Sequence, residues 1–191
     1  RIRVERGRKV ESCIRDMNIN IAIIGLGTRG SYLYKDLLKK RNRLRKKTSM
    51  APNVSFVSAK NKQKKRGINI PKSKWLGNYL DAASHPKVDI VVELIGGSDG
   101  AAKKLVFAAL KNKKHVVTAN KALIAKHGDK LSKIAENNKV NLEFEAAVCG
   151  GVPIGRSLKE GLIDNSIQKI YGIFNGTSNF ILYAMEKQNI E

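Results

Sequence analysis

The stretch Ile19-Asn20-Ile21-Ala22-Ile23-Ile24-Gly25-Leu26-Gly27-Thr28-Arg29-Gly30 decides the fold of this chain. Its first half is an apolar run, and residues 21–24 are uninterrupted, as in a strand buried on both faces of a parallel sheet. The glycines then have the spacing of a dinucleotide-binding turn. Gly25 permits the tight bend, Gly27 lets the backbone approach a pyrophosphate, and Gly30 allows close packing of helix on strand. A helix-like stretch follows, which favours this interpretation over a turn without a ligand.

The end of the second predicted strand, residues 54–57, bears on which dinucleotide binds. Ser58, Ala59 and Lys60 follow it, and the loop at residues 61–66 adds more cations and no carboxylate. An acidic residue at this place holds the ribose 2′-hydroxyl of NAD(H), whereas a lysine and a hydroxyl donor suit the 2′-phosphate of NADP(H). We therefore predict that NADP(H) is preferred over NAD(H) and that Lys60 is the main cation. Most of the other lysines are expected to form a solvated loop.

The net charge of the chain is +21 at pH 7, and its cations cluster at residues 35–74, where Asp36 is the only acid. Such a cluster raises the alternative of a nucleic-acid-binding protein, because clustered cations release phosphate counterions on binding. The cluster has few aromatic residues: Phe56 lies within it, inside a predicted strand, and Trp75 directly follows it. With few rings to stack bases, we expect non-specific adhesion at low salt and no specific nucleic-acid partner.

Cys13 and Cys149 are the only cysteines, so the chain has neither a disulfide framework nor zinc-ligand spacing. No apolar stretch approaches the ~20 residues of a membrane span, and the amino terminus lacks the apolar core of a signal peptide. A cytoplasmic location without membrane contact is therefore expected. Residues 1–16 are polar and mixed in charge, and they are predicted to form a disordered extension, with Met17 a candidate natural start.

Predicted strands and helices alternate along the chain, which indicates an α/β fold with a Rossmann-type doubly wound parallel sheet. We assign residues 17–148 to this dinucleotide-binding domain. Ligands of such sheets bind beyond the carboxyl ends of the strands, where residues 25–30, Gly96 with Gly97, and residues 118–121 are expected to lie. The strands are predicted at residues 19–24, 54–57, 88–95, 115–118 and 140–146, and the helices at residues 31–47, 75–83, 101–112 and 129–137.

The character of the sequence changes in residues 149–191, which we assign to the beginning of a second, α+β domain. Pro153 opens a predicted helix that runs to Gly161. A strand is predicted at residues 167–174 and a further helix at residues 177–187. This part would be an incomplete catalytic domain.

Several segments together resemble homoserine dehydrogenases, from about Ile19 to the end of the chain. The resemblance implies the amino-terminal NADP-binding domain of that family and the start of its catalytic domain. It also implies NADP(H)-linked interconversion of L-homoserine and L-aspartate 4-semialdehyde, in threonine and methionine biosynthesis, by a protein that is a homo-oligomer at full length. The segments are residues 25–28 (GLGT), 57–60 (VSAK), 92–97 (VELIGG), 117–123 (VTANKAL), 145–154 (EAAVCGGVPI) and 171–179 (YGIFNGTSN).

The family motifs also imply roles for single residues. Lys121 would lie at the nicotinamide and substrate edge as a supporting catalytic residue, although without the motif it would be taken for a solvated lysine at a helix start. Gly176 and Thr177 would lie near the substrate. The residues expected to line the cofactor are Gly25, Leu26, Gly27, Thr28, Arg29, Gly30, Lys60, Gly96, Gly97, Thr118 and Lys121.

A monovalent-cation site, usually for sodium, is implied by the same resemblance. Glu145 and the backbones of Val148, Gly150 and Val152 match it. A carboxylate followed by a glycine-rich turn can present oxygens to a hard cation, but from spacing alone a simple strand end is equally plausible. The thiol of Cys149 suggests covalent catalysis of aldehyde oxidation, yet nothing nearby activates this thiol. We interpret Cys149 as a packing residue.

The chain departs from the family pattern in ways that affect its expected activity. Lys60 stands where arginine is common, and Arg29 replaces a small apolar residue. The family's acidic homoserine ligands and its acid–base lysine belong to a segment downstream of residues 177–187, so we expect this chain to bind cofactor and to be nearly inactive. An alternative within enzymes is another two-domain Rossmann semialdehyde dehydrogenase or reductase.

Overall fold

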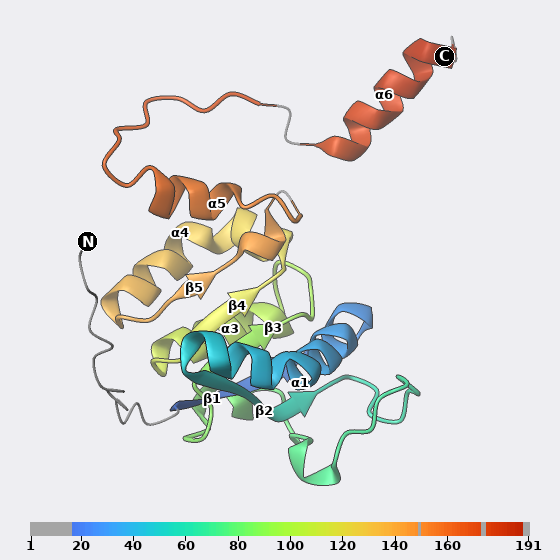
Figure 1. The fold of residues 1–191 in the computed structure, drawn as a ribbon, viewed down its shortest axis with the longest axis vertical. Coiled ribbons are helices and arrows are strands. Elements are labelled where there is room, and N and C mark those ends of the chain that lie inside the picture. The colour runs from blue at the N-terminus through green and yellow to red at the C-terminus, as the bar shows by residue number, and fades with distance from the viewer. Residues whose placement is uncertain (1–16, 149, 173–174, 189–191) are drawn as a thin grey trace, which may run out of the picture.

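The computed structural model describes residues 17–148, 150–172 and 175–188 (Figure 1). The predicted extension at residues 1–16 and Cys149 lie outside the described residues. Five strands form one parallel sheet in the order β2-β1-β3-β4-β5, which confirms the predicted fold class. The strands are β1 (Met17–Ile24), β2 (Met50–Ser58), β3 (Ile90–Glu93), β4 (His115–Thr118) and β5 (Leu142–Glu143).

The strand order places the carboxyl ends of β1 and β3 at the centre of the fold. From β1 the chain runs to β2 at one edge and then crosses to β3 on the other side of β1. The connections after β1 and β3 therefore diverge, and this divergence leaves a crevice beyond the ends of the two strands in doubly wound sheets. The glycine turn at residues 25–30 follows β1, and Gly96 with Gly97 follows β3.

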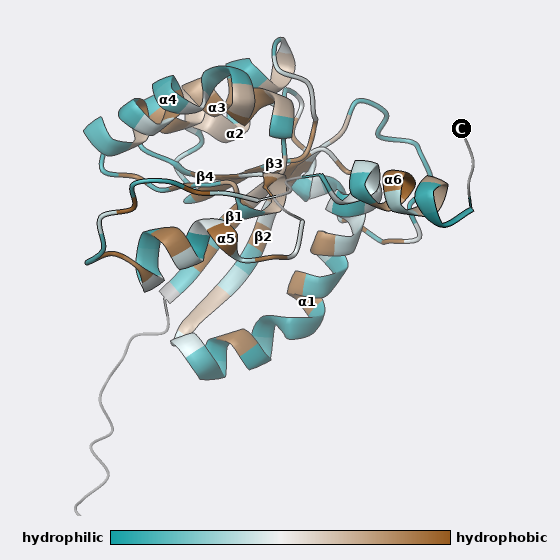
Figure 2. Cartoon of the chain, turned by 90° about the horizontal axis from the view of Figure 1, so that it is seen from above, coloured by the Kyte–Doolittle hydropathy of each residue, from teal (hydrophilic) through white to brown (hydrophobic). Residues whose placement is uncertain are grey.

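Helices cover both faces of the sheet, as Figure 2 shows, with α1 on one side and α3 and α4 on the other. The two faces have separate apolar cores because neighbouring residues of a strand point to opposite faces. Ala22 and Ile24 belong to the core under α3 and α4, whereas Ile21 and Ile23 belong to the core under α1. The helices of this domain are α1 (Thr28–Thr48), α2 (Asp81–Ser84), α3 (Ala101–Lys111) and α4 (Lys121–Asn137).

Strands β2 and β3 have different limits from those predicted, and the reasons are local. Strand β2 begins at Met50 and includes Pro52, which was expected to precede it. Strand β2 lies at the edge of the sheet and has a neighbouring strand on one side only. The missing N–H of Pro52 can therefore face the unpaired side without loss of a hydrogen bond between strands. Strand β3 is confined to Ile90–Glu93, shorter than the predicted residues 88–95, and Ile95 is already 41% exposed.

Helix α4 begins eight residues earlier than predicted, at Lys121. The side chain of Asn120 caps it, since Oδ1 of Asn120 accepts a hydrogen bond of 3.1 Å from the backbone N–H of Leu123. An asparagine before a helix is a common N-cap, and this signal was present in the sequence. The earlier start matters because it makes Lys121 the first residue of a helix at the carboxyl edge of the sheet.

Two further predicted elements are shorter than expected, and each has a 3₁₀ turn next to it. The helix predicted at residues 75–83 is found only at its end, as α2, because Trp75 instead forms an isolated parallel bridge with Val57; the 3₁₀ turn η1 (Lys72–Lys74) precedes it. The strand predicted at residues 140–146 is paired only over Leu142–Glu143 and then tightens into the 3₁₀ turn η2 (Glu145–Ala147).

The second part of the chain is mostly exposed. The predicted helix after Pro153 is found as α5 (Ile154–Arg156) followed by one π-helical stretch, η3 (Ser157–Gly161). The strand predicted at residues 167–174 is wrong for residues 167–172, which have no neighbouring strand, and residues 173–174 lie outside the described part. Helix α6 (Gly176–Gln188) stands apart from the sheet in Figure 1. In the described residues, no helix is long and apolar enough to cross a membrane.

The core under α3 and α4 is expected to dominate stability. Leu105 lies in this core and has no exposed surface, so Leu105→Ala should lower the free energy of unfolding by about 2–5 kcal/mol. The matched control is Leu38→Ala in α1, where the side chain is 49% exposed and the change should stay within about 0.5 kcal/mol. Urea denaturation followed by circular dichroism measures both, and equal losses would contradict this assignment of the core.

Candidate cofactor-binding site

The glycine turn is locked to both neighbouring strands at Gly25. Gly25 has φ +108°, and a Cβ atom built there would lie 2.5 Å from the carbonyl oxygen of Leu94 at the end of β3. Its N–H donates a hydrogen bond of 2.9 Å to the carbonyl oxygen of Ser58 at the end of β2. Only glycine fits this position, which joins the carboxyl ends of β1, β2 and β3.

The other two glycines of the turn have separate structural roles. A Cβ atom on Gly30 would lie 2.0 Å from the carbonyl oxygen of Gly25, so the first turn of α1 packs directly on the turn. Gly27 is the N-cap of α1, and no atom lies within 4 Å of the place of its Cβ. No side chain caps this helix end, so the first backbone N–H groups of α1 remain open to an anion.

Arg66 is the cation that contacts the glycine turn, and sequence analysis did not single it out. Its Nε donates a hydrogen bond of 2.9 Å to the carbonyl oxygen of Leu26, and its guanidinium lies 5.7 Å from the centre of the Trp75 ring. Arginine suits this role because its planar fork carries five donors. The basic loop after β2 is thereby folded against the turn. The guanidinium also donates to the backbone carbonyl oxygens of Asn61, Lys62 and Lys64.

Lys60 is exposed and forms no hydrogen bond or ion pair with the described part of the chain. It follows Ser58, whose carbonyl oxygen accepts the N–H of Gly25. The predicted cofactor cation therefore lies at the same sheet edge as the glycine turn, with its ammonium group still free. In the part of the chain that follows, a cavity of about 240 Å³ is lined by Lys62, Lys64, Lys65, Arg66, Ile68, Asn69, Ile70 and Trp75.

The structure brings the other two predicted segments to the same edge of the sheet. Gly96 and Gly97 both have positive φ, at +89° and +84°, which carries the chain sharply away from β3. The amide nitrogen of Asn120 donates a hydrogen bond of 2.7 Å to the carbonyl oxygen of Gly97. This bond joins the double-glycine turn to the start of α4, where Lys121 is exposed.

Asp99 fixes the far side of the same loop to α4, a contact that the sequence did not predict. One carboxylate oxygen accepts a hydrogen bond of 2.7 Å from Nζ of Lys126, and the other lies 3.3 Å from Nε2 of His127. The hydrogen bond from Lys126 is the largest cause that holds the pKa of the Asp99 carboxyl well below its usual range. The loop between β3 and α3 is therefore tied to the start and the body of α4 at two points, Gly97 and Asp99.

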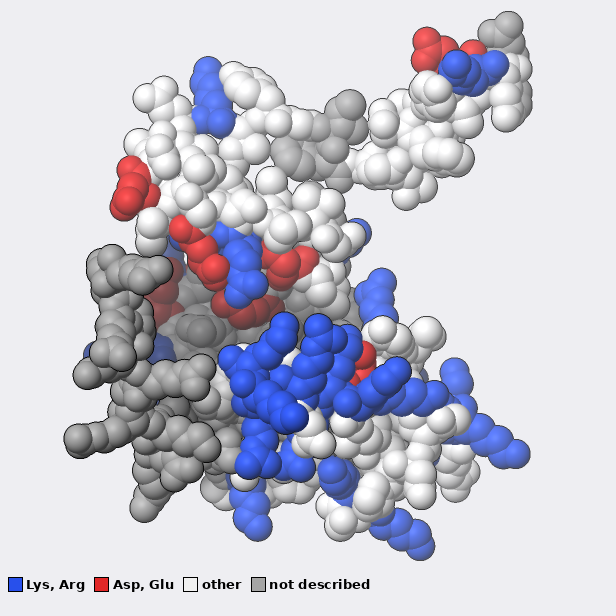
Figure 3. All heavy atoms as spheres, in the orientation of Figure 1, with Lys and Arg blue, Asp and Glu red and all other residues white. Residues whose placement is uncertain are grey.

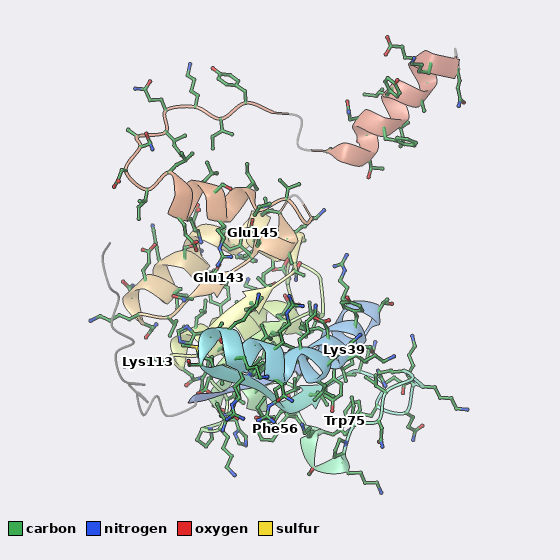
Figure 4. All side chains as sticks on the ribbon, viewed as in Figure 1. Lys39, Phe56, Trp75, Lys113, Glu143 and Glu145 are labelled. Carbon is green, nitrogen blue, oxygen red and sulfur yellow. The ribbon has the colours of Figure 1, made fainter. Side chains whose placement is uncertain are left out.

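The predicted cation ligand Glu145 lies at the opposite end of the sheet from Trp75, beneath α5, as Figure 4 shows. It is the first residue of η2 rather than the end of a strand. Its Oε1 is buried and has no hydrogen-bond partner in the described structure, and its Oε2 lies 2.7 Å from the place of a Cβ on Gly155. A buried carboxylate oxygen without a partner is costly, and a bound cation would relieve that cost.

Only part of the predicted cation site is gathered in one place. Glu145 and Val148 line a cavity of about 400 Å³, together with residues of α5 and η3. Gly150 and Val152 are exposed in the turn that follows. The described residues contain no group of three or more His, Cys, Asp or Glu that could hold a metal, so a cation here would depend on backbone oxygens.

The predicted substrate residues are not at the sheet edge. Gly176 and Thr177 are exposed at the start of α6, which stands apart from the sheet in Figure 1. The structure therefore leaves them separate from the glycine turn and from Lys121.

A parallel sheet with a glycine turn after its first strand and an uncapped helix beyond it defines the class of Rossmann-type dinucleotide-binding domains. The family model described as the NAD-binding domain of homoserine dehydrogenase matches residues 25–145, and a second model, homoserine dehydrogenase, matches residues 153–191. The chain belongs to the homoserine dehydrogenase family.

Its relatives are consistent in sequence and in structure. The homoserine dehydrogenase of Bacillus subtilis is 41% identical over 170 residues, which are 89% of this chain and 39% of that protein. The crystal structure of a homoserine dehydrogenase from Thiobacillus denitrificans matches with a TM-score of 0.78 at 39% identity and likewise covers 89% of this chain and 39% of its own. A hyperthermophilic archaeal homoserine dehydrogenase solved in complex with NADPH matches with a TM-score of 0.64 at 25% identity, over 78% of this chain and 50% of its own.

The two roles assigned to Gly30 and Gly27 can be separated by alanine substitution. Gly30→Ala should lower the free energy of unfolding by roughly 1–3 kcal/mol, because its Cβ meets backbone that cannot move aside. Gly27→Ala should leave stability almost unchanged and weaken NADPH binding, because its Cβ enters the space where a pyrophosphate approaches. Thermal denaturation and fluorescence titration measure the two effects. Unaltered NADPH binding by Gly27→Ala would contradict the placement of the pyrophosphate.

Proposed function

We propose that this chain is the cofactor-binding part of an NADP(H)-dependent homoserine dehydrogenase that interconverts L-homoserine and L-aspartate 4-semialdehyde. The chain spans 39% of the length of the Bacillus subtilis relative, so the reaction is proposed for the whole protein and cofactor binding for this part. One observation carries the proposal: an open glycine turn is joined to the end of β2, where lysine and arginine stand in place of a carboxylate.

The preference for NADP(H) is supported by the charges around the adenosine end of the site. A 2′-phosphate needs cations there, and an acidic residue would repel it. Figure 3 shows lysine and arginine side chains gathered over the face that carries α1. Arg66 is occupied by backbone carbonyl oxygens, whereas Lys60 has no partner in the described residues. Among the free cations of this loop, Lys60 is the nearest to the end of β2 in the sequence, and we therefore expect it to bind the phosphate.

The reaction needs a hydride donor or acceptor and a proton transfer at the substrate oxygen. The nicotinamide ring supplies the hydride chemistry when the cofactor is bound. Lys121, exposed at the start of α4, would lie beside the ring and support the negative charge that develops on the substrate oxygen. General acid–base help, which contributes about 10²- to 10⁴-fold to rates, would come from the downstream segment of the whole protein and not from Lys121.

Removal of the Lys60 charge tests the cofactor preference. Lys60→Ala should weaken NADPH binding by about tenfold or more, the value of a charge-assisted hydrogen bond, and should change NADH binding by less than about twofold. Lys130→Ala, at an exposed position of α4, removes the same charge elsewhere and is the control. Both Kd values are measured by fluorescence titration. Equal losses for NADPH and NADH would mean that the role of Lys60 is structural.

We further propose that Glu145 binds a monovalent cation, with sodium the expected ion and the backbone oxygens of Val148, Gly150 and Val152 as partners. The support is the buried, unpartnered Oε1 of Glu145. A carboxylate with carbonyl oxygens is a suitable ligand set for a hard cation.

Sodium should therefore stabilise the folded chain. At ten times its Kd, sodium would add about 1.4 kcal/mol and raise the Tm by roughly 3–6 °C above that in choline chloride of equal ionic strength. Glu145→Gln should abolish this difference, because the amide brings no charge to the cation. Equal Tm values for the wild-type chain in the two salts would refute the cation site.

A further inference from the structure

Glu93 is a carboxylate with no exposed surface at the carboxyl end of β3. A buried charge is costly unless it is paired or hydrogen-bonded. No lysine, arginine or histidine pairs with it in the described structure, and three hydrogen bonds satisfy it instead. Its Oε1 accepts the N–H groups of Ile95 at 2.7 Å and Gly96 at 3.0 Å, and its Oε2 accepts the hydroxyl of Thr118 at 2.5 Å.

The same hydrogen bonds continue to the start of α4. The Thr118 oxygen accepts the backbone N–H of Asn120 at 3.1 Å, and the Asn120 amide donates to the Gly97 carbonyl oxygen at 2.7 Å. Glu93, the double-glycine turn, Asn120 and Thr118 thus form a closed ring of hydrogen bonds. Thr118 has no exposed surface and Asn120 only 6%, so water has little access to replace a broken link.

This ring lies on the far side of the glycine turn from Lys60. The N–H of Leu94, between β3 and the double-glycine turn, donates a hydrogen bond of 2.8 Å to the Ile24 carbonyl oxygen at the end of β1. Lys60 follows β2, on the other side of β1. A dinucleotide with its adenosine at β2 and its pyrophosphate at β1 would therefore extend its nicotinamide half over the ends of β3 and β4.

We propose that Glu93 is a positioning residue that, through Thr118 and Asn120, holds the double-glycine turn and the start of α4 in the arrangement that accepts the nicotinamide half of the cofactor. This inference rests on the proposed function. The carboxylate is suited to the role because it can only accept hydrogen bonds, and all three of its partners donate one to it. A glutamine would direct an amide donor at one of these donors and leave a buried N–H or O–H group unsatisfied.

Two probes separate positioning of the nicotinamide half from general stability. NADPH reports on both halves of the site, and 2′,5′-ADP carries the phosphorylated adenosine without nicotinamide. In calorimetric titrations of this chain, Glu93→Gln and Thr118→Val should each weaken NADPH binding by about tenfold and leave the Kd of 2′,5′-ADP within about twofold. The fluorescence enhancement of bound NADPH should fall as well. Thr118→Ser keeps the hydroxyl and should restore both signals.

Each alternative outcome has a distinct meaning. Equal weakening of NADPH and 2′,5′-ADP, or no weakening of either, would overturn the positioning role of Glu93. A wild-type chain that binds neither probe would defeat the cofactor assignment itself, and this inference with it. If Glu93→Gln fails to fold, as judged by circular dichroism, the comparison of Thr118→Val with Thr118→Ser decides, because that pair leaves the carboxylate in place.

Discussion

The close approach of Gly25 to the end of β3 is the constraint on which the rest of the site depends. A Cβ atom at this residue would lie 2.5 Å from the Leu94 carbonyl oxygen, and its N–H is bonded to Ser58. Through these contacts the ends of three parallel strands meet at one backbone position. The uncapped start of α1, the basic loop after β2 and the double-glycine turn after β3 are arranged around it.

The two cations near this junction, Arg66 and Lys60, have different roles, and the chemistry of each side chain explains the difference. The fork of Arg66 is used within the chain, where four backbone carbonyl oxygens accept its N–H groups. Lys60 carries a compact charge at an exposed position beside the turn. The arginine holds the loop after β2 against the glycine turn, and the lysine is the residue that we propose for the ligand. The positive cluster in the sequence is thus partly structural, a distinction that composition alone does not make.

The opposite end of the site is built from a buried negative charge without a cation. Glu93 is satisfied by two backbone N–H groups and one hydroxyl, so its charge serves as an acceptor for a turn and not as half of an ion pair. The end proposed to bind adenosine is positive and exposed, whereas the end at Glu93 is buried and fixed by hydrogen bonds. Such an asymmetry suits a cofactor whose phosphates need charge and whose reactive ring needs accurate placement.

The sequence by itself determined the class of fold, the glycine turn, most strand and helix positions and the family, because apolar runs and glycine spacing are local signals. Tertiary structure decided the ends of β3 and β5, the 3₁₀ turn at Glu145 and the lack of a strand at residues 167–172, because pairing requires neighbours that local sequence does not specify. It also decided the partners of Arg66 and Glu93. Their residue types were visible from the start, but the oxygens and N–H groups that satisfy them come together only when the loops after β1, β2, β3 and β4 meet at one edge.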